Sequence, residues 1–467
     1  MRKLSLAVLA SSLLAACAGS SGPCDGVTGT CVAIAANATE SVISAAFVQA
    51  TANSTIAFPA ATFKFTNSLN LASVKGVTIK GAGIGSTILD FSTVTGSGEG
   101  IVASGTDSLL FIDFTARDTK GNGIKVVGSN GVTWRRVQTT WSNPDGHTHG
   151  AYGLYPVQSH NILIENCEVA GAADAGIYVG QSDHIVVRNN NVHDSVAGIE
   201  IENSSYSNVH DNNSHGNVGG ILVFNMPDLQ INDGDFHHVY NNTIQANNTV
   251  NFAARGSSVA RVPGGTGAFV LGGHDIEVDH NTFTNNNAAA FSVISYPLTG
   301  DPRVNDCFGT PSWSPVNYCT KMWPAKIYVH DNTFTGNGSH AGISTPADCP
   351  DPTNPGNATD CPDPVAYQLS EMLLLTSAST GGSVNPLVYD GMIDPTATTT
   401  TYGGTSADLQ EICYGPSGSN GTAAFLDLQF ASSGGTDFSK MTTDMTPFRC
   451  TLPSQTLLDT DVTTKAP

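Results

Sequence analysis

The sequence predicts an all-β fold in which short parallel strands stack as the coils of a solenoid. Two observations carry this prediction: a repeat of about 22 residues through the middle of the chain, and alternating Ile and Val within each unit. The repeat is clearest where GIYVGQSDHIVVRNNNVHDSVA, from Gly176, is followed by GIEIENSSYSNVHDNNSHGNVG, from Gly198. Alternation indicates strands, and the intervening Gly, Asn, Asp and Ser indicate turns. Because one unit is too short for a crossover helix, we expect each coil to stack directly on the next.

A column of asparagines supports the same register. Aligning the units on the apolar residue after glycine produces the column Cys167, Asn190, Asn212, Asn242, Asn281 and Asn332. Asn tolerates the left-handed backbone of a turn, and stacked Asn side chains can hydrogen-bond from coil to coil, each bond contributing about 1 kcal/mol net. Asn is common in turns generally, but its recurrence in register favours a ladder.

This repeat resembles that of the right-handed parallel β-helix proteins, the superfamily of pectate lyases and alginate epimerases, from Ser68 to about Ile343. The resemblance implies a right-handed β-helix, which we expect over residues 39–343, and leaves the chemistry open because many activities share this scaffold. Thr39-Glu40 before SVISAAFVQA predicts a short amphipathic helix that caps the open end of the solenoid. Residues 344–467 lack the repeat and are expected to form an irregular, disulfide-bonded C-terminal segment.

Residues 1–17 are predicted to be a lipoprotein signal peptide. The start MRK is followed by an apolar stretch that is too short for a membrane span. Leu14-Ala15-Ala16-Cys17 resembles a bacterial lipobox, which implies cleavage before Cys17 and lipid on its thiol. An ordinary signal peptide is the alternative. Ala18 after the cysteine favours, by the same resemblance, the outer membrane of a bacterial cell envelope, with residues 18–38 as a tether.

The ten cysteines fit an exported protein, in which disulfides are permitted. Apart from Cys17, four neighbouring pairs are expected to bond: Cys24–Cys31, Cys307–Cys319, Cys349–Cys361 and Cys413–Cys450. Cys167 is left over in the asparagine column, and we expect it to be a buried, inert thiol.

The charge balance restricts the partners. The net charge is −20, with only 19 Lys and Arg. Nucleic acid and anionic membrane surfaces are therefore disfavoured, which leaves the lipid as the expected membrane contact.

Alternate residues of each repeat point outward and form the candidate binding surface. The first outward column is Lys125, Tyr155, Tyr178, Glu200, Leu222 and Phe269, and the second contains Val157, Gly180 and Glu202. Tyr155, Tyr178, Glu200 and Glu202 are predicted to form one exposed patch with Lys125 at its end. Aromatic faces beside carboxylates suit sugar rings. The alternative is an ordinary β-sheet surface.

Three overlong coils indicate insertions, which in solenoids become loops, often on the binding face. The first, Thr139–Tyr152, is expected to overhang the patch and contains His147 and His149. These alternate residues would face one side of an extended loop and are candidate ligands for a carbohydrate or a metal. His237-His238 is expected in the second insertion. Histidine pairs in such Gly- and Asp-rich loops are more often solvated, and metal binding is the alternative.

Tyr152-Gly-Leu-Tyr155-Pro156-Val157-Gln158 resembles the alginate-epimerase motif Tyr-Gly-Phe-Asp-Pro-His-Glu. Tyr155 and Val157 replace the family's Asp and His, so epimerase activity of that type is not expected. The candidate catalytic residues are Lys120, Tyr152 and Glu200.

A lyase of the pectate type would need an acidic Ca²⁺ cluster and a basic residue. Asp174, Glu200 and Glu202 are the candidate Ca²⁺ ligands. Arg135, Arg136 and Arg255 are the candidate bases.

Longer stretches, among them HTHGAYGLYPVQSHNILIENCEVAGAADAGIYVGQS and EICYGPSGSNGTAAFLDLQF, resemble an exported β-helix subgroup of unknown biochemical role. Its genes often lie beside one for a cytochrome-related exported protein. Three functions follow as alternatives: binding or processing a carbohydrate polymer, as a lyase or by related uronate chemistry if enzymatic; a non-enzymatic partner of that exported protein; or a structural surface protein.

Overall fold

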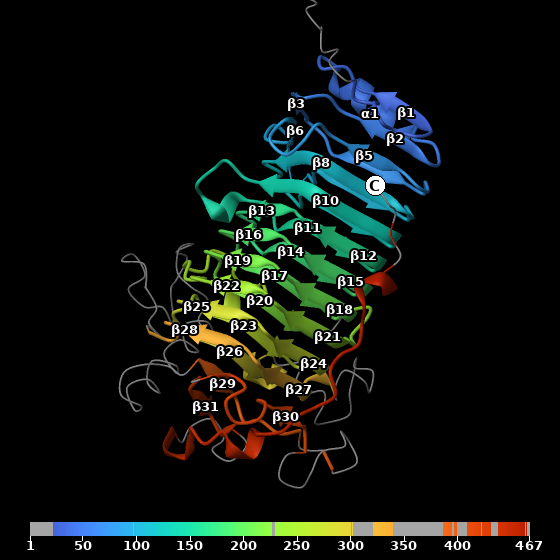
Figure 1. Ribbon diagram of the computed structural model, residues 1–467. Helices are drawn as coiled ribbons and strands as arrows, with labels where there is room; N and C mark the ends of the chain where they lie inside the picture. Colours follow the sequence, from blue (N-terminus) through green and yellow to red (C-terminus); the bar gives the residue numbers. More distant parts are fainter. Residues whose placement is uncertain are drawn as a thin grey trace, which may run out of the picture.

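In the computed structural model the chain forms a parallel β-helix, as predicted (Figure 1). The structure describes residues 22–96, 98–226, 229–299, 301, 321–339, 386–394, 397–398, 409–421, 423–430, 438–462 and 464. The predicted lipidation site Cys17 and the pairs Cys307–Cys319 and Cys349–Cys361 lie outside these residues.

One stack of strands, here called sheet B, contains one strand from each successive coil. Its members are β4 (Leu69–Ala72), β7 (Ile101–Ser104), β9 (Ile124–Val127), β11 (Tyr152–Val157), β14 (Ala175–Gly180), β17 (Ala197–Glu202), β20 (Gly219–Phe224), β23 (Thr266–Leu271), β26 (Ala289–Ile294), β29 (Leu387–Tyr389) and β31 (Phe425–Asp427). The pairings between neighbouring strands of this stack are parallel.

The other two stacks are joined through the long strands β8 (Leu109–Arg117) and β10 (Asn130–Thr140) into sheet A. One stack contains β1 (Thr30–Ala33), β2 (Ser54–Ala57), β5 (Thr78–Lys80), β12 (His160–Glu165), β15 (Asp183–Arg188), β18 (Ser205–His210), β21 (Asp235–Tyr240), β24 (His274–Asp279), β27 (Ala325–His330) and β30 (Ile412–Cys413). The other contains β3 (Ala61–Lys64), β6 (Thr87–Asp90), β13 (Glu168–Ala170), β16 (Asn191–His193), β19 (Asn213–His215), β22 (Thr243–Gln245), β25 (Thr282–Thr284) and β28 (Thr333–Thr335).

The predicted alternation places apolar side chains inside the coils. Ile177, Ile199 and Ile221 pair in register on adjacent strands and are fully or almost fully buried. Each buried Ile or Val contributes about 1.5–3 kcal/mol through the hydrophobic effect.

The predicted asparagine ladder is present and runs one coil further than expected. From Asn190 through Asn212, Asn242, Asn281 and Asn332 to Asn420, each Nδ2 donates to the next Oδ1 at 2.9 to 3.3 Å. The Cys167 N–H donates to Asn190 Oδ1 at 2.9 Å, so Cys167 starts this ladder as a buried free thiol, as predicted. A second ladder, which we did not predict, joins Asn217, Asn247, Asn286 and Asn337.

Both ends of the solenoid extend beyond the predicted limits. Helix α1 (Glu40–Val48) buries Ile43 and Phe47, as expected of a cap. Strand β1, however, already pairs with β2 inside the segment expected to be a tether, next to the Cys24–Cys31 disulfide. At the other end, β29, β30 and β31 continue both sheets beyond residue 343, and Cys413–Cys450 is bonded as predicted.

The C-terminal residues run back along the outer face of sheet A, drawn in red in Figure 1. Asp459 pairs with Arg188 and His210, and the backbone oxygen of Leu457 accepts a hydrogen bond from Asn208. Short 3₁₀ turns occur at Gly146–Thr148, Val259–Arg261, Tyr296–Thr299, Phe438–Lys440, Thr446–Phe448 and Asp459–Asp461. Within the described ranges, no helix has the length and apolar character needed to span a bilayer.

Candidate functional site

The outer face of sheet B has the register that the repeat predicts. Tyr155 pairs with Lys125, and Tyr178 pairs with Glu200 on the next coil. The column continues through Leu222 and Phe269. The residues expected to form one patch therefore lie side by side.

The predicted exposure of this patch is wrong. Tyr178, Glu200 and Glu202 are only 5%, 2% and 9% exposed, although they point away from the solenoid interior. Tyr155 and Lys125 are half-buried. The repeat pattern identifies which side chains point outward, but it does not show what covers them.

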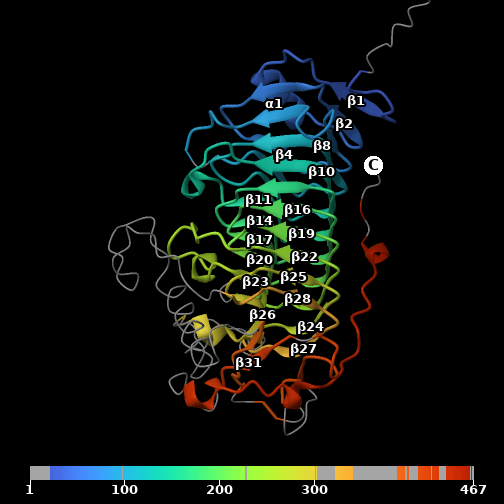
Figure 2. The ribbon, with the colours of Figure 1, turned by 60° about the vertical axis from the view of Figure 1, so that its left-hand side comes forward.

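Two loops cover this face. Phe252, Val259 and Val262 belong to the loop between β22 and β23, and they pack in one apolar cluster with Tyr178 and Leu222. The other loop is the predicted insertion Thr139–Tyr152: its Gly146 lies directly against the Phe252 ring. Both loops project on the side of the β11–β23 stack in Figure 2.

Three tyrosine rings form the centre of the site. The ring centroids of Tyr152 and Tyr178 are 4.5 Å apart, those of Tyr152 and Tyr155 are 4.6 Å apart, and those of Tyr155 and Tyr178 are 4.9 Å apart. Burial is the main cause that raises the pKa of Tyr155 to about 12 and the pKa of Tyr152 and Tyr178 well above the usual value. The phenols therefore keep their protons at physiological pH and can donate hydrogen bonds.

Three carboxyl groups, Asp174, Glu200 and Glu202, lie beside these rings; with the three tyrosines they form what we call the tyrosine–carboxylate cluster. Burial, and then the charge of Glu202, raise the pKa of Asp174 to about 7. Burial, followed by Asp174 and Glu202, raises the pKa of Glu200 well above its usual value. Burial also raises the pKa of Glu202, although hydrogen bonds from Tyr178 and Glu200 oppose this shift.

Two oxygens of the cluster are buried without a partner. Asp174 Oδ1 and Glu200 Oε2 accept no hydrogen bond from any residue that the structure describes. An unsatisfied buried polar group costs about 1–3 kcal/mol, and strongly shifted carboxyls with such atoms are typical of functional sites.

Lys125 lies at the edge of the cluster, as predicted. Its Nζ is 5.2 Å from the centre of the Tyr155 ring and 3.6 Å from Glu99 Oε1. Glu99 was not predicted, because it lies in the turn before β7 rather than in the repeat.

Further along sheet B, the same outer face becomes apolar. A pocket of about 100 Å³ lies beside β20, β23 and β26, under the loop that contains Val259. Its walls include Phe224, Phe269, Leu271, Ile294, Tyr296 and Val262. No pattern in the sequence predicted this pocket, because the loop residues that close it lie outside the repeat.

His147 and His149 do not form the predicted ligand pair. They lie in and next to a 3₁₀ turn rather than in an extended segment. Both ring nitrogens of His149 contact backbone oxygens, at 2.5 Å from Gly171 and 2.7 Å from Asn143, and its ring stacks on Trp141. His147 instead packs edge-on against Phe252, at 6.2 Å between centroids.

The predicted basic residues do not line the cluster. Arg135 pairs with Glu165, and Arg136 with Asp113, on sheet A. Lys120 is exposed in the turn between β8 and β9, and Arg255 is exposed in the loop that contains Phe252. The alternation along β10 does not show whether its outward side chains belong to sheet A or to sheet B.

Asp174, Glu200 and Glu202 also lack the spacing of a cation site. In the described part of the chain, one group of three His, Cys, Asp or Glu residues has ligand atoms within 4.8 Å of one another, and it is His238, Glu277 and Asp279 on sheet A. His237 and His238 lie in strand β21, not in an insertion as expected. Their strand could have been recognised from Asn242, which follows it in the ladder.

Comparisons with known proteins agree with this architecture. A family described as "Right handed beta helix region" matches residues 73–233 and 139–298. No curated protein matches the chain significantly.

Several solved structures share the fold at low similarity. The A-module of the Azotobacter vinelandii mannuronan C-5 epimerase AlgE4 is 15% identical, with 68% of this chain and 88% of that chain covered and a TM-score of 0.43. The alginate lyase AlyF-OU02 in complex with G6 is 14% identical, with 67% and 72% covered and a TM-score of 0.37. An exopolygalacturonase from Thermotoga maritima is 11% identical, with 62% and 70% covered and a TM-score of 0.35.

At these scores the structural matches carry no information on activity. The family match, the 22-residue repeat and the stacked parallel strands establish that the chain is a right-handed parallel β-helix repeat protein.

Proposed function

We propose that this β-helix binds and cleaves a carbohydrate polymer at the outer face of sheet B, with the tyrosine–carboxylate cluster as the reacting centre. The observation that carries the proposal is Glu200: it is buried, its Oε2 has no hydrogen-bond partner, and it lies among two further carboxyls. A bound ligand would supply the missing partner.

The shifted pKa values suit acid–base chemistry. Burial and neighbouring charges raise the pKa of Glu200 well above its usual value, which favours its protonated form. It would donate this proton to the oxygen that leaves when a glycosidic bond breaks. Asp174, whose pKa is about 7, would accept a proton from the attacking water, whose hydroxyl adds to the anomeric carbon.

The charge balance favours a neutral polymer over a polyuronate. Four carboxyl groups, those of Glu99, Asp174, Glu200 and Glu202, act on Tyr155, and among the described residues Lys125 is the cation at the edge of this cluster. A uronate carboxylate would have only Lys125 to neutralise it there, and any ionised carboxyl of the cluster would repel it. The tyrosine rings offer apolar faces for a sugar ring, and their hydroxyls offer hydrogen bonds.

The loops would control access. Because Phe252 packs over the cluster and meets Gly146 and His147, a polymer reaches Glu200 only after the two loops separate. Closure around the substrate would then exclude water from the carboxyls.

A polysaccharide panel with product analysis tests this proposal. The panel should contain neutral glucans, galactans and mannans together with alginate and polygalacturonate. We expect new reducing ends from a neutral polymer, and a 100- to 10,000-fold lower turnover in Glu200→Gln with little change in binding.

Glu168→Gln is the matched control, because Glu168 is half-buried on β13 of sheet A. Equal turnover in Glu200→Gln and wild type would refute the catalytic role. Absence of binding to every polymer, combined with co-purification with an exported cytochrome-related protein, would favour the scaffold alternative.

Lipid anchoring is a separate proposal that rests on the lipobox-like Leu14–Cys17. Cys17→Ser should leave an unprocessed precursor, detected by mass spectrometry. Normal processing and membrane fractionation of this variant would contradict it.

A further inference from the structure

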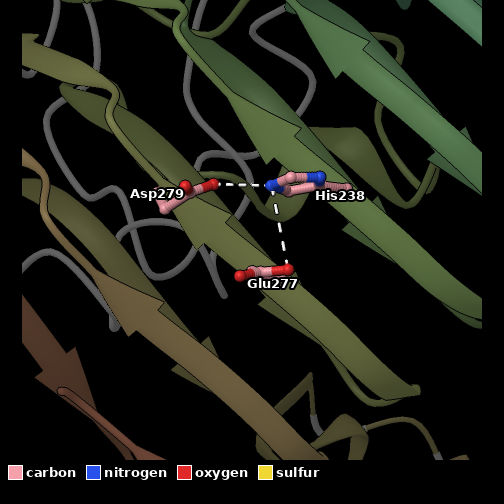
Figure 3. Close-up of side chains that lie close together, drawn as sticks. All are labelled: His238, Glu277 and Asp279. Atoms are coloured by element: carbon pink, nitrogen blue, oxygen red, sulfur yellow. Dashed lines mark hydrogen bonds and ion pairs between the residues drawn. The ribbon is translucent and has the colours of Figure 1, made fainter. Parts of the chain in front are cut away.

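Outside the tyrosine–carboxylate cluster, three potential metal ligands converge on the outer face of sheet A. His238 on β21 pairs in register with Glu277 on β24, and Asp279 lies two residues further on the same strand and the same face. His238 Nε2 is 2.6 Å from Asp279 Oδ1 and 3.8 Å from Glu277 Oε2. Figure 3 shows one nitrogen of His238 directed at both carboxylates.

Each of the two carboxylates is also held by a second histidine. Glu277 Oε1 lies 2.9 Å from His330 Nε2, and Asp279 Oδ2 lies 2.6 Å from His280 Nδ1. Each carboxylate therefore turns one oxygen towards His238 and has the other fixed by a second histidine. Partners of this kind orient first-shell ligands in metal sites, and their loss typically lowers metal affinity 10- to 100-fold.

We propose that His238 Nε2, Glu277 Oε2 and Asp279 Oδ1 bind a divalent transition-metal cation of the Zn²⁺ class, with water at the remaining position. One imidazole and two carboxylates, with room for water, match the ligand types and number of open zinc sites. Ca²⁺ is disfavoured because it takes six to eight oxygen ligands, and an imidazole nitrogen suits zinc and its neighbours better.

The present spacing is close to what such a cation needs. Bonds of about 2.0–2.2 Å place tetrahedral ligand atoms roughly 3.3 Å apart. The 3.8 Å separation of His238 Nε2 from Glu277 Oε2 is near this value. The hydrogen bond between His238 and Asp279 would lengthen by roughly 0.7 Å as the cation replaces the shared proton.

Within the site, His238 is the most exposed of the three ligands. The side chain of His238 is 18% exposed, whereas that of Glu277 is 2% exposed. The backbone N–H of Gln455, in the C-terminal segment, donates to Glu277 Oε2 at 2.6 Å. The site is independent of the proposed glycan cleavage, which takes place on sheet B.

Zinc titration of the full chain tests the proposal. After chelator treatment and dialysis, isothermal titration calorimetry should show one Zn²⁺ per chain. We expect at least 100-fold weaker binding in His238→Gln and about 10-fold weaker binding in His330→Gln. The matched control is His160→Gln: His160 pairs with Asp183 at 2.6 Å on the same sheet, outside the site, and its loss should change nothing.

Two results would overturn the proposal: no Zn²⁺ binding by the wild-type chain, or equally tight binding by His238→Gln. If His238→Gln does not fold, as judged by circular dichroism, Co²⁺ added to the wild-type chain decides the question. Visible absorption bands of a nitrogen–oxygen cobalt site support the proposal, and their absence refutes it.

Discussion

Two buried glutamates, one on the outer face of each sheet, have pKa shifts in opposite directions. Glu200 on sheet B and Glu165 on sheet A are similarly buried, at 2% and 6% exposure. The pKa of Glu200 is raised by burial, Asp174 and Glu202. Burial also acts to raise the pKa of Glu165, but hydrogen bonds from Arg188 and Arg135 outweigh it and lower the pKa.

The difference shows that the neighbours, rather than burial alone, decide the charge of these groups. On sheet A, Glu165 pairs with two arginines. Asp459 of the C-terminal segment pairs there with Arg188 and His210. The cluster on sheet B has Lys125 only at its edge. The neighbours of Glu165 therefore favour its ionised form, whereas those of Glu200 favour its protonated form.

The largest expected effect is the difference in stability loss between tyrosine substitutions on the two faces. Tyr178→Ala should destabilise the protein by about 3–5 kcal/mol, because Tyr178 is covered by the loop cluster and its loss leaves a cavity. Tyr206→Ala on sheet A should change stability by under about 1 kcal/mol, because Tyr206 is 41% exposed. Urea unfolding measures both. Similar values for the two variants would mean that the loops do not cover sheet B in solution.

The next effect compares the two glutamates. Glu165→Gln should cost about 2–4 kcal/mol, because it leaves Arg135 and Arg188 without their carboxylate. Glu200→Gln should cost less stability than Glu165→Gln, because the raised pKa of Glu200 favours the protonated carboxyl, which a neutral amide resembles. Urea unfolding of both variants measures this difference. A larger loss of stability in Glu200→Gln than in Glu165→Gln would contradict the raised pKa of Glu200.

The contributions of Asp174, beside sheet B, and Glu165, on sheet A, to the pH dependence of stability should have opposite signs. The folded pKa of Asp174 is about 7 against 3.8 unfolded, so its contribution falls as pH rises from about 4 to 7. The lowered pKa of Glu165 acts the other way: its stabilisation is present above pH 4.5 and is lost as pH falls below that value.

Asp174→Asn should therefore flatten the decline between pH 5 and pH 7 by about 2 kcal/mol. Free energies of unfolding measured by urea at each pH provide the check. An unchanged slope would show that Asp174 titrates normally in the folded chain.

The smallest effect concerns Cys167, inside the coils and away from both outer faces. Burial raises the pKa of its thiol to about 12, so alkylation should fail in the native protein and succeed after denaturation. Mass spectrometry after iodoacetamide treatment measures this. Rapid labelling of Cys167 under native conditions would mean that the coil interior opens readily.

The sequence alone determined the coils, their register and the identity of the outward column. The 22-residue period and the column from Asn190 to Asn332 reflect contacts between neighbouring coils, which repeat with the chain. For the same reason Tyr155, Tyr178 and Glu200 could be placed side by side from their positions after glycine.

Only the tertiary structure decided the environment of those side chains. Phe252 and Val262 cover Tyr178 from a loop without a repeat, and no local pattern specifies where such a loop packs. The convergence of His238 with Glu277 and Asp279 depends on the register between β21 and β24, and the connection between these strands contains a long loop without a repeat. Charge states depend on distances to every neighbour, and those distances exist only once the coils and loops have folded together.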